Sequence, residues 1–178
     1  MTNKVENLYT PNCIRTVSGI YMNVFDPTPE MICIEDIAHS LSMQCRFGGH
    51  LPRFYSVAQH SLYCSYLVDD EKLKLAALLH DASEAYLLDI PKPIKGGLSN
   101  YKEIEDNLMR LIADKFGFEY PLHPDIKRAD EQMLEAEWYH LMLGNDPHKL
   151  PTTDFAQTKK NFISIWDNLR NTKNNDIR

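Results

Sequence analysis

The chain has 178 residues, of which 43% are hydrophobic and 25% are charged, and its formal net charge is −6 with a pI near 5.6. This length supports one well-cored domain and is short for two. The acidic balance argues against a nucleic-acid-binding surface, and no stretch approaches the roughly 18 apolar residues of a membrane span. With no signal-peptide-like run at the N-terminus, we expect a soluble, cytoplasmic protein without nucleic-acid or membrane partners.

The four cysteines, Cys13, Cys33, Cys45 and Cys64, are scattered through the first part of the chain without a C-x-x-C pair. In a reducing compartment this pattern is typical of free thiols that pack like small apolar residues. The sequence therefore predicts neither a zinc ribbon nor a disulfide framework.

The segment TVSGIYMNVFDPTPEMICIED, residues 16–36, has β-branched and aromatic residues on either side of Asp26-Pro27-Thr28-Pro29. This arrangement predicts a short β-hairpin before the first helix. We divide the chain into an N-terminal extension at 1–34, a main domain at 35–173 and a polar tail at 174–178.

Helical patterns follow, separated by short polar, Gly or Pro segments. Ser56 and Asp70 each stand just before an apolar stretch, where their side chains can cap a helix. The sequence predicts an all-α domain with helices at 35–43, 56–68, 71–87, 99–116, 123–143 and 153–170.

The stretch LAALLHDASEAYLLDIPKPIK, residues 75–95, places three ionisable side chains in an otherwise apolar helix. If the helix is continuous, His80 and Glu84 lie one turn apart on one face and Asp81 lies one position round. Burying a carboxylate in an apolar setting costs roughly several kcal/mol unless it is paired or bound to a cation. We therefore expect partners for these groups elsewhere in the core.

Two other helices supply such partners. His60 shares a stripe with Val57, Cys64 and Leu67, and Asp130 shares one with Ile126, Met133, Leu134 and Glu137. Two imidazoles and two carboxylates that project from helices into a core form a ligand set for one divalent ion, with positions left for water. The ion can be Mn, Co, Fe, Ni, Mg or Zn.

These motifs resemble the HD-domain metal-dependent phosphohydrolases, and within them the bacterial 5′-deoxynucleotidases and related phage dATP triphosphohydrolases. The resemblance covers roughly residues 35–143 and is carried by His60 in VAQHS, His80-Asp81 in HDASE, Asp130 in KRADEQ, and the Arg46-Phe47 pair. It implies a single HD-domain helical bundle, a homodimer, and one metal ion held by His60, His80, Asp81 and Asp130. Two departures affect substrate choice: only twenty residues separate the two histidines, and Phe47 stands where the deoxynucleotidases have tryptophan.

A metal ion in this set lowers the pKa of a bound water and supplies a nucleophile at neutral pH. Glu84 is the first candidate to orient that water or carry its proton, and Asp89 is the second. Arg46 and Lys95 are predicted to bind phosphate, with Phe47 beside them. Pro91 and Pro93 predict a stiff segment in which Ile90 and Lys92 are extended.

The leading interpretation is a 5′-deoxynucleotidase that releases phosphate from deoxynucleoside monophosphates. A deoxynucleoside triphosphate triphosphohydrolase is the first alternative. A (p)ppGpp hydrolase is less favoured, because such enzymes usually carry a Glu-Asp pair where this chain has Glu84-Ala85. The non-enzymatic alternative is a metal-containing module that binds a nucleotide, and Glu137 and Trp138 are candidates to touch a base or ribose.

Overall fold

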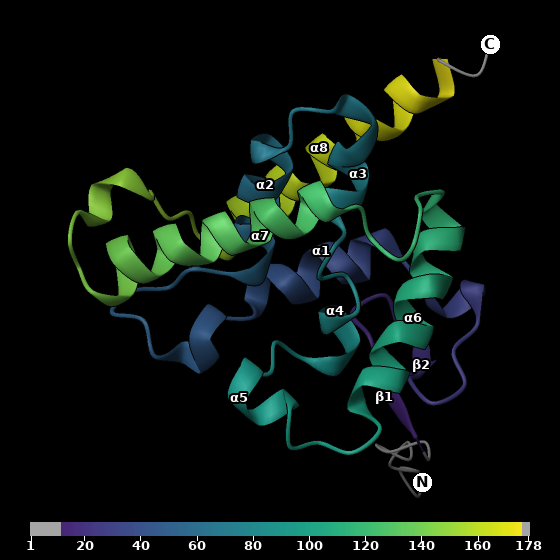
Figure 1. The fold of residues 1–178 in the computed structure, drawn as a ribbon. Coiled ribbons are helices and arrows are strands. Elements are labelled where there is room, and N and C mark those ends of the chain that lie inside the picture. The colour runs from purple at the N-terminus through teal and green to yellow at the C-terminus, as the bar shows by residue number, and fades with distance from the viewer. Residues whose placement is uncertain (1–11, 176–178) are drawn as a thin grey trace, which may run out of the picture.

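The computed structural model describes residues 12–175, and this part of the chain is mainly helical with one small β-hairpin (Figure 1). The predicted all-α class is confirmed, as is the presence of a hairpin. The elements, in chain order, are β1 (Cys13–Arg15), β2 (Tyr21–Asn23), α1 (Ile34–Met43), α2 (Val57–Leu67), α3 (Glu71–Leu78), α4 (Glu84–Leu87), α5 (Lys92–Lys95), α6 (Tyr101–Phe116), α7 (Pro124–Glu137) and α8 (Phe155–Asn175).

The hairpin turns at a different place from the one predicted. β1 pairs antiparallel with β2, with Ile14 opposite Met22, and the turn lies at residues 16–20. Gly19 has φ +89° there, a conformation that glycine adopts without strain. The segment at 26–29 instead leads into a short 3-10 turn. Met22 is fully buried in the main core, and the Ser18 N–H and hydroxyl donate to the Asp36 carboxylate, so the hairpin is attached to α1.

Both predicted helix caps are present. The Ser56 hydroxyl accepts a hydrogen bond from the Gln59 N–H, and the Asp70 carboxylate accepts one from the Lys72 N–H. Each cap satisfies one backbone donor that the first helical turn leaves free. At the other end of the chain, α8 continues to Asn175, beyond its predicted end, so the polar tail falls partly in this helix and partly outside the described residues.

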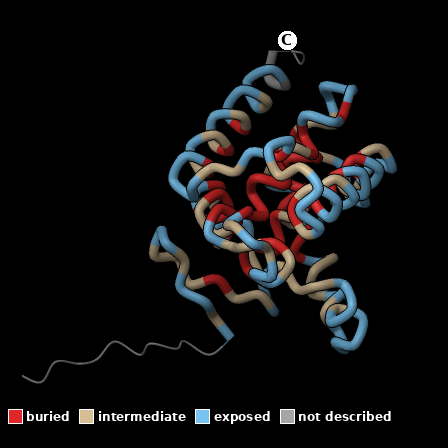
Figure 2. Tube along the Cα trace, turned by 90° about the vertical axis from the view of Figure 1, so that its left-hand side faces the viewer, coloured by how far each residue is buried: buried red, intermediate tan, exposed pale blue. Residues whose placement is uncertain are grey.

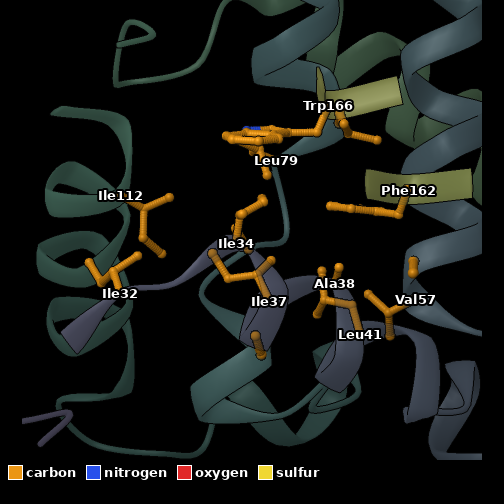
Figure 3. Packing of buried hydrophobic residues seen from close by; sticks show 14 of the residues in the cluster. Ile32, Ile34, Ile37, Ala38, Leu41, Val57, Leu79, Ile112, Phe162 and Trp166 are labelled. Atoms are coloured by element: carbon orange, nitrogen blue, oxygen red, sulfur yellow. The ribbon is translucent and has the colours of Figure 1, made fainter. Parts of the chain in front are cut away.

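The central helix α2 packs against both α7 and α8. In Figure 1, α7 (green) crosses in front of α2 and α8 (yellow) lies behind it. The main apolar core fills the side of α2 that faces α1 and α8, where Phe162 lies near Ala38 and Val57 (Figure 3). Buried segments are concentrated at the centre of the molecule (Figure 2). No helix among the described residues is both long and apolar enough to cross a membrane.

The predicted continuous helix at 71–87 is wrong. α3 ends at Leu78, and the next backbone bonds join residues three apart, from the Ala82 N–H to the Leu79 carbonyl and from the Glu84 N–H to the Asp81 carbonyl. The His80 side chain accounts for the break, because its Nδ1 bonds the Ala77 carbonyl that an uninterrupted helix would use. His80 and Asp81 therefore lie in a turn between α3 and α4.

Two further helices differ from prediction. Lys92 is not extended: it begins α5, whose Ile94 and Lys95 N–H groups donate to the Pro91 carbonyl. Pro93 is tolerated because it lies in the first turn, where an N–H has no helical partner. The helix predicted at 123–143 keeps α geometry only as far as Glu137 and continues as a π-helix over Trp138–Met142.

Candidate metal centre

The four predicted metal ligands meet at one point in the fold, from α2, from the turn between α3 and α4, and from α7. His60 Nε2 lies 3.1 Å from Asp130 Oδ1 and 3.8 Å from Asp81 Oδ2. His80 Nε2 lies 3.2 Å from Asp81 Oδ2 and 3.8 Å from Asp130 Oδ1. Each imidazole nitrogen thus faces both carboxylates.

These separations suit ligands of a single divalent ion. Bonds of about 2.0–2.2 Å place two ligand atoms roughly 2.9–3.4 Å apart at angles between 90° and tetrahedral, and about 4.2 Å apart when they are opposite. The distances of 3.1 and 3.2 Å fall in the first range, and the two of 3.8 Å lie between it and the opposite arrangement. These four nitrogen–oxygen separations are therefore compatible with ligands of one metal ion.

The hydrogen bonds of both histidines point the correct nitrogen at the centre. His60 Nδ1 is 2.6 Å from Glu137 Oε1, and His80 Nδ1 is 2.8 Å from the Ala77 carbonyl oxygen. With Nδ1 engaged, Nε2 is the nitrogen available to a ligand, which is the arrangement typical of metal-bound histidine. The buried His80 Nε2 has no hydrogen-bond partner among the described residues, and a metal ion would satisfy it.

The electrostatics of the metal-free site fit the same conclusion. Burial opposes protonation of His80, but the adjacent Asp81 carboxylate outweighs it and raises the pKa of His80 to about 10. Burial would raise the pKa of Asp81, yet His80 and His60 hold it well below its usual range. The two imidazoles and the two carboxylates thus favour each other's charged forms, and a divalent cation can take the place of protons beside the carboxylates.

Glu137 is a site residue whose role the sequence analysis missed. It is fully buried and its Oε2 accepts hydrogen bonds from Arg46 Nη2 at 3.0 Å and Nε at 3.2 Å, while its Oε1 binds His60. The sequence signal for this role was the position of Glu137 on the same helix stripe as Asp130. The predicted phosphate ligand Arg46 is thereby held in place, and its Nη1 lies 3.8 Å from Asp81 Oδ2, on the side of the metal ligands.

The buried Glu84 forms a second pair with the half-buried Lys95 beside the candidate ligands. Lys95 Nζ lies 2.9 Å from Glu84 Oε1 and 2.9 Å from Glu105 Oε1, a partner that the sequence did not predict. Burial raises the pKa of Glu84 to about 8, with further contributions from the Asp81 and Asp89 carboxylates against the opposing effect of Lys95. Glu84 is thus a carboxyl group that can exchange a proton near neutral pH.

Asp89 and Phe47 are the remaining predicted site residues. Asp89 is half-buried, and burial raises the pKa of its carboxyl group. Phe47 has left-handed backbone angles (φ 55°, ψ 32°), and its ring centroid lies 5.6 Å from the Arg46 guanidinium carbon and 6.2 Å from the Trp138 ring centroid. The His123 side chain accepts a hydrogen bond from the Asp125 N–H and so caps α7.

A cavity of about 340 Å³ opens beside the ligands. Its lining includes three of the candidate ligands, His80, Asp81 and Asp130, together with Lys95 and Glu105. The other lining residues are Ser83 and, from α6 to the first turns of α7, Met109, Tyr120, Pro121, Leu122, Ile126 and Lys127. A larger cavity, of about 600 Å³, lies between α3 and α8 and contains none of the four ligands. We assign the candidate site to the smaller cavity, because that is where the ionisable groups meet.

No family model matches the chain. The uncharacterized protein YfdR of Escherichia coli strain K12 is 45% identical to it over 124 residues, which are 70% of this chain and 69% of YfdR. The chain belongs to the YfdR family. An uncharacterized protein of Rhodobacter capsulatus is 40% identical over 124 residues, 65% of this chain and 63% of that protein. Neither relative is described by an activity.

Proposed function

We propose that the chain is an HD-domain metal-dependent phosphohydrolase that acts on nucleotides, with deoxynucleoside monophosphates as leading substrates. The observation that carries the proposal is the pair of buried imidazoles, His60 and His80, whose Nε2 atoms face Asp81 and Asp130 at 3.1–3.8 Å. The sequence resemblance to 5′-deoxynucleotidases supports the same reaction.

His60, His80, Asp81 and Asp130 would hold the metal ion, and Glu137 would orient His60 toward it. When bound, the ion supplies a water activated at neutral pH and a positive charge for a phosphoryl oxygen. The surrounding residues bind the substrate and move its protons.

Glu84 is the first candidate to accept the proton of the activated water and return it, because the pKa of its carboxyl group is about 8. In the metal-free protein the Lys95 amine lies 2.9 Å from Glu84 Oε1 and lowers the pKa of Glu84. An incoming phosphate that competes for this amine would raise the pKa of Glu84 and so favour proton acceptance by its carboxyl group. Asp89 is the second candidate for the same role.

Arg46 and Lys95 would meet the negative charge of the phosphate. Arg46 uses Nε and Nη2 to bind Glu137, so Nη1 is the donor that faces the site. A cavity of about 340 Å³ lies within the roughly 300–1,000 Å³ typical of ligand pockets, which supports a small-molecule substrate.

The test is phosphate release from a panel of deoxy- and ribonucleoside mono-, di- and triphosphates and ppGpp, with Mn²⁺, Co²⁺ or Mg²⁺ added to metal-stripped protein. We expect metal-dependent release from deoxynucleoside monophosphates and none from the Asp81→Ala variant. Release of intact triphosphate would instead favour the triphosphohydrolase. If protein that binds metal releases phosphate from none of these compounds, the nucleotide-binding module would become the favoured interpretation.

The Glu84→Gln variant distinguishes a phosphohydrolase from a module that only binds a nucleotide. The substitution keeps the shape of the side chain and removes the exchangeable proton. We expect turnover to fall while metal binding and nucleotide binding persist. Retained turnover in this variant would remove Glu84 from the mechanism and direct attention to Asp89.

A further inference from the structure

We propose that Cys64 is a ligand of the same metal ion, so that the centre is built for a thiophilic ion such as Zn²⁺, Co²⁺ or Fe²⁺ and against Mg²⁺ and Mn²⁺. The proposal rests on the metal centre of the proposed function and adds a sulfur donor to its nitrogen and oxygen donors. Thiolates bind soft and borderline ions preferentially, whereas Mg²⁺ and Mn²⁺ are held by oxygen.

The geometry places the thiol on the metal-facing side of α2. Cys64 follows His60 by four residues, one helical turn, and its Sγ lies 3.4 Å from His60 Nε2. Donor atoms of His60, Cys64, His80 and Asp130 all lie within 4.8 Å of one another. Bonds of about 2.3 Å to sulfur and 2.0–2.1 Å to nitrogen separate the two ligand atoms by roughly 3.1–3.6 Å at angles between 90° and tetrahedral.

A second observation points to an ion at the same place. The buried His80 Nε2 has no hydrogen-bond partner among the described residues, and it belongs to the group of donor atoms that includes the Cys64 sulfur. Because His60 Nδ1 is bound to Glu137, His60 also presents only Nε2 to this group. Two directed nitrogens, a carboxylate and a fully buried thiol therefore converge on one point.

Coordination changes the thiol in a defined way. The S–H bond breaks, the proton leaves to solvent, and the electron pair on sulfur forms the bond to the metal, whose oxidation state is unchanged. Wild-type protein should therefore release one more proton per bound Zn²⁺ than a variant that lacks this thiol. The competing interpretation is that Cys64 only fills the small apolar cluster of Tyr55, Met133, Leu141 and Leu150.

The experiment titrates Co²⁺ into metal-stripped protein and records the near-ultraviolet spectrum, where a thiolate bound to Co²⁺ gives a charge-transfer band. The variants are Cys64→Ala and Cys64→Ser, which remove the sulfur and change the volume little. The control is Cys33→Ser, because Cys33 donates its own hydrogen bond to Glu35 and a serine can keep that bond. Circular dichroism checks that each variant is folded, and equilibrium dialysis counts the bound Co²⁺.

We expect the band in wild type and Cys33→Ser at one Co²⁺ per chain, and its loss in both Cys64 variants while Co²⁺ still binds. Competition should show that Zn²⁺ affinity falls about tenfold or more in Cys64→Ala, since even residues that only support a ligand contribute 10- to 100-fold. Mn²⁺ affinity should change much less.

A wild-type protein that binds one Co²⁺ without the band, or a band that survives in Cys64→Ala, would overturn the proposal. Phosphate release by that Co²⁺-loaded protein would then show that the proposed function stands without a sulfur ligand. A protein that binds no Co²⁺ at all would refute both the sulfur ligand and the metal centre.

Discussion

Replacement of Glu137 tests whether one buried carboxylate supports both the proposed metal ligand His60 and the proposed phosphate ligand Arg46. Glu137 is fully buried, Arg46 is 8% exposed, and their side chains are joined by two hydrogen bonds of 3.0 and 3.2 Å. The other Glu137 oxygen lies 2.6 Å from His60 Nδ1. A change at this position therefore has separate consequences for stability and for metal affinity.

The expected losses follow from these contacts. Glu137→Ala leaves the Arg46 guanidinium buried without its main partner, and breaking a buried ion pair in this way costs about 3–5 kcal/mol. For a chain of this length that corresponds to a fall in Tm of roughly 6–20 °C. Glu137→Gln keeps one oxygen acceptor but turns an N–H group toward either Arg46 or His60, both of which are donors. The loss of unfolding free energy should therefore be smaller, about 1–3 kcal/mol.

Metal affinity should fall in the same variants, because His60 loses the group that fixes its tautomer and orientation. Loss of such a supporting partner typically weakens metal binding by about 10- to 100-fold. The assays are urea unfolding of metal-free protein and Zn²⁺ titration of folded protein. Glu135→Ala is the matched control on α7, since Glu135 is exposed. A Glu137→Ala variant as stable as this control, with unchanged Zn²⁺ affinity, would refute the reasoning.

Three further results are expected. Chelation should lower the Tm of the metal-loaded protein by about 5–10 °C relative to protein with the ion at a hundredfold excess over its Kd, and added ion should restore it. Because the folded chain raises the pKa of Glu84 from 4.5 to about 8, it binds this proton more tightly than the unfolded chain does, so metal-free protein should lose stability as pH rises through that window. Urea unfolding across this pH range should show a flatter profile for Glu84→Gln, and an unchanged profile would remove Glu84 as the cause. Lys95→Ala should lower the free energy of unfolding by roughly 1–3 kcal/mol, because it leaves Glu84 buried without its cation. Lys95→Arg should keep most of the wild-type stability, and equal stability of the two variants would contradict this reasoning.

The positions of the helices were largely predictable because their signals are local. Apolar residues at helical spacing and the capping side chains of Ser56 and Asp70 predicted α1, α2 and the start of α3 to within a residue or two. The hairpin turn was misplaced, because Gly19 and its positive φ carry less sequence signal than the two prolines at 27 and 29.

His80 and Asp81 were predicted as metal ligands from geometry that the structure does not have. A continuous helix would have turned the two side chains about 100° apart and aligned His80 with Glu84. In the observed turn, His80 and Asp81 both reach the centre, and Glu84 begins a new helix that directs it to Lys95. The sequence could not show this break, because it depends on a side chain of the centre itself, His80, taking the Ala77 carbonyl.

Ligands and their supporting residues differ in what the sequence can show. His60 and Asp130 are polar residues on stripes of apolar ones, a local pattern that makes each a candidate ligand before any contact is known. Glu137 lies on the same stripe, but its partners Arg46 and His60 are 91 and 77 residues away in the chain. Whether such a carboxylate touches substrate or holds a ligand in place depends on how α7 crosses α2, and that crossing is set by the packing of the whole core.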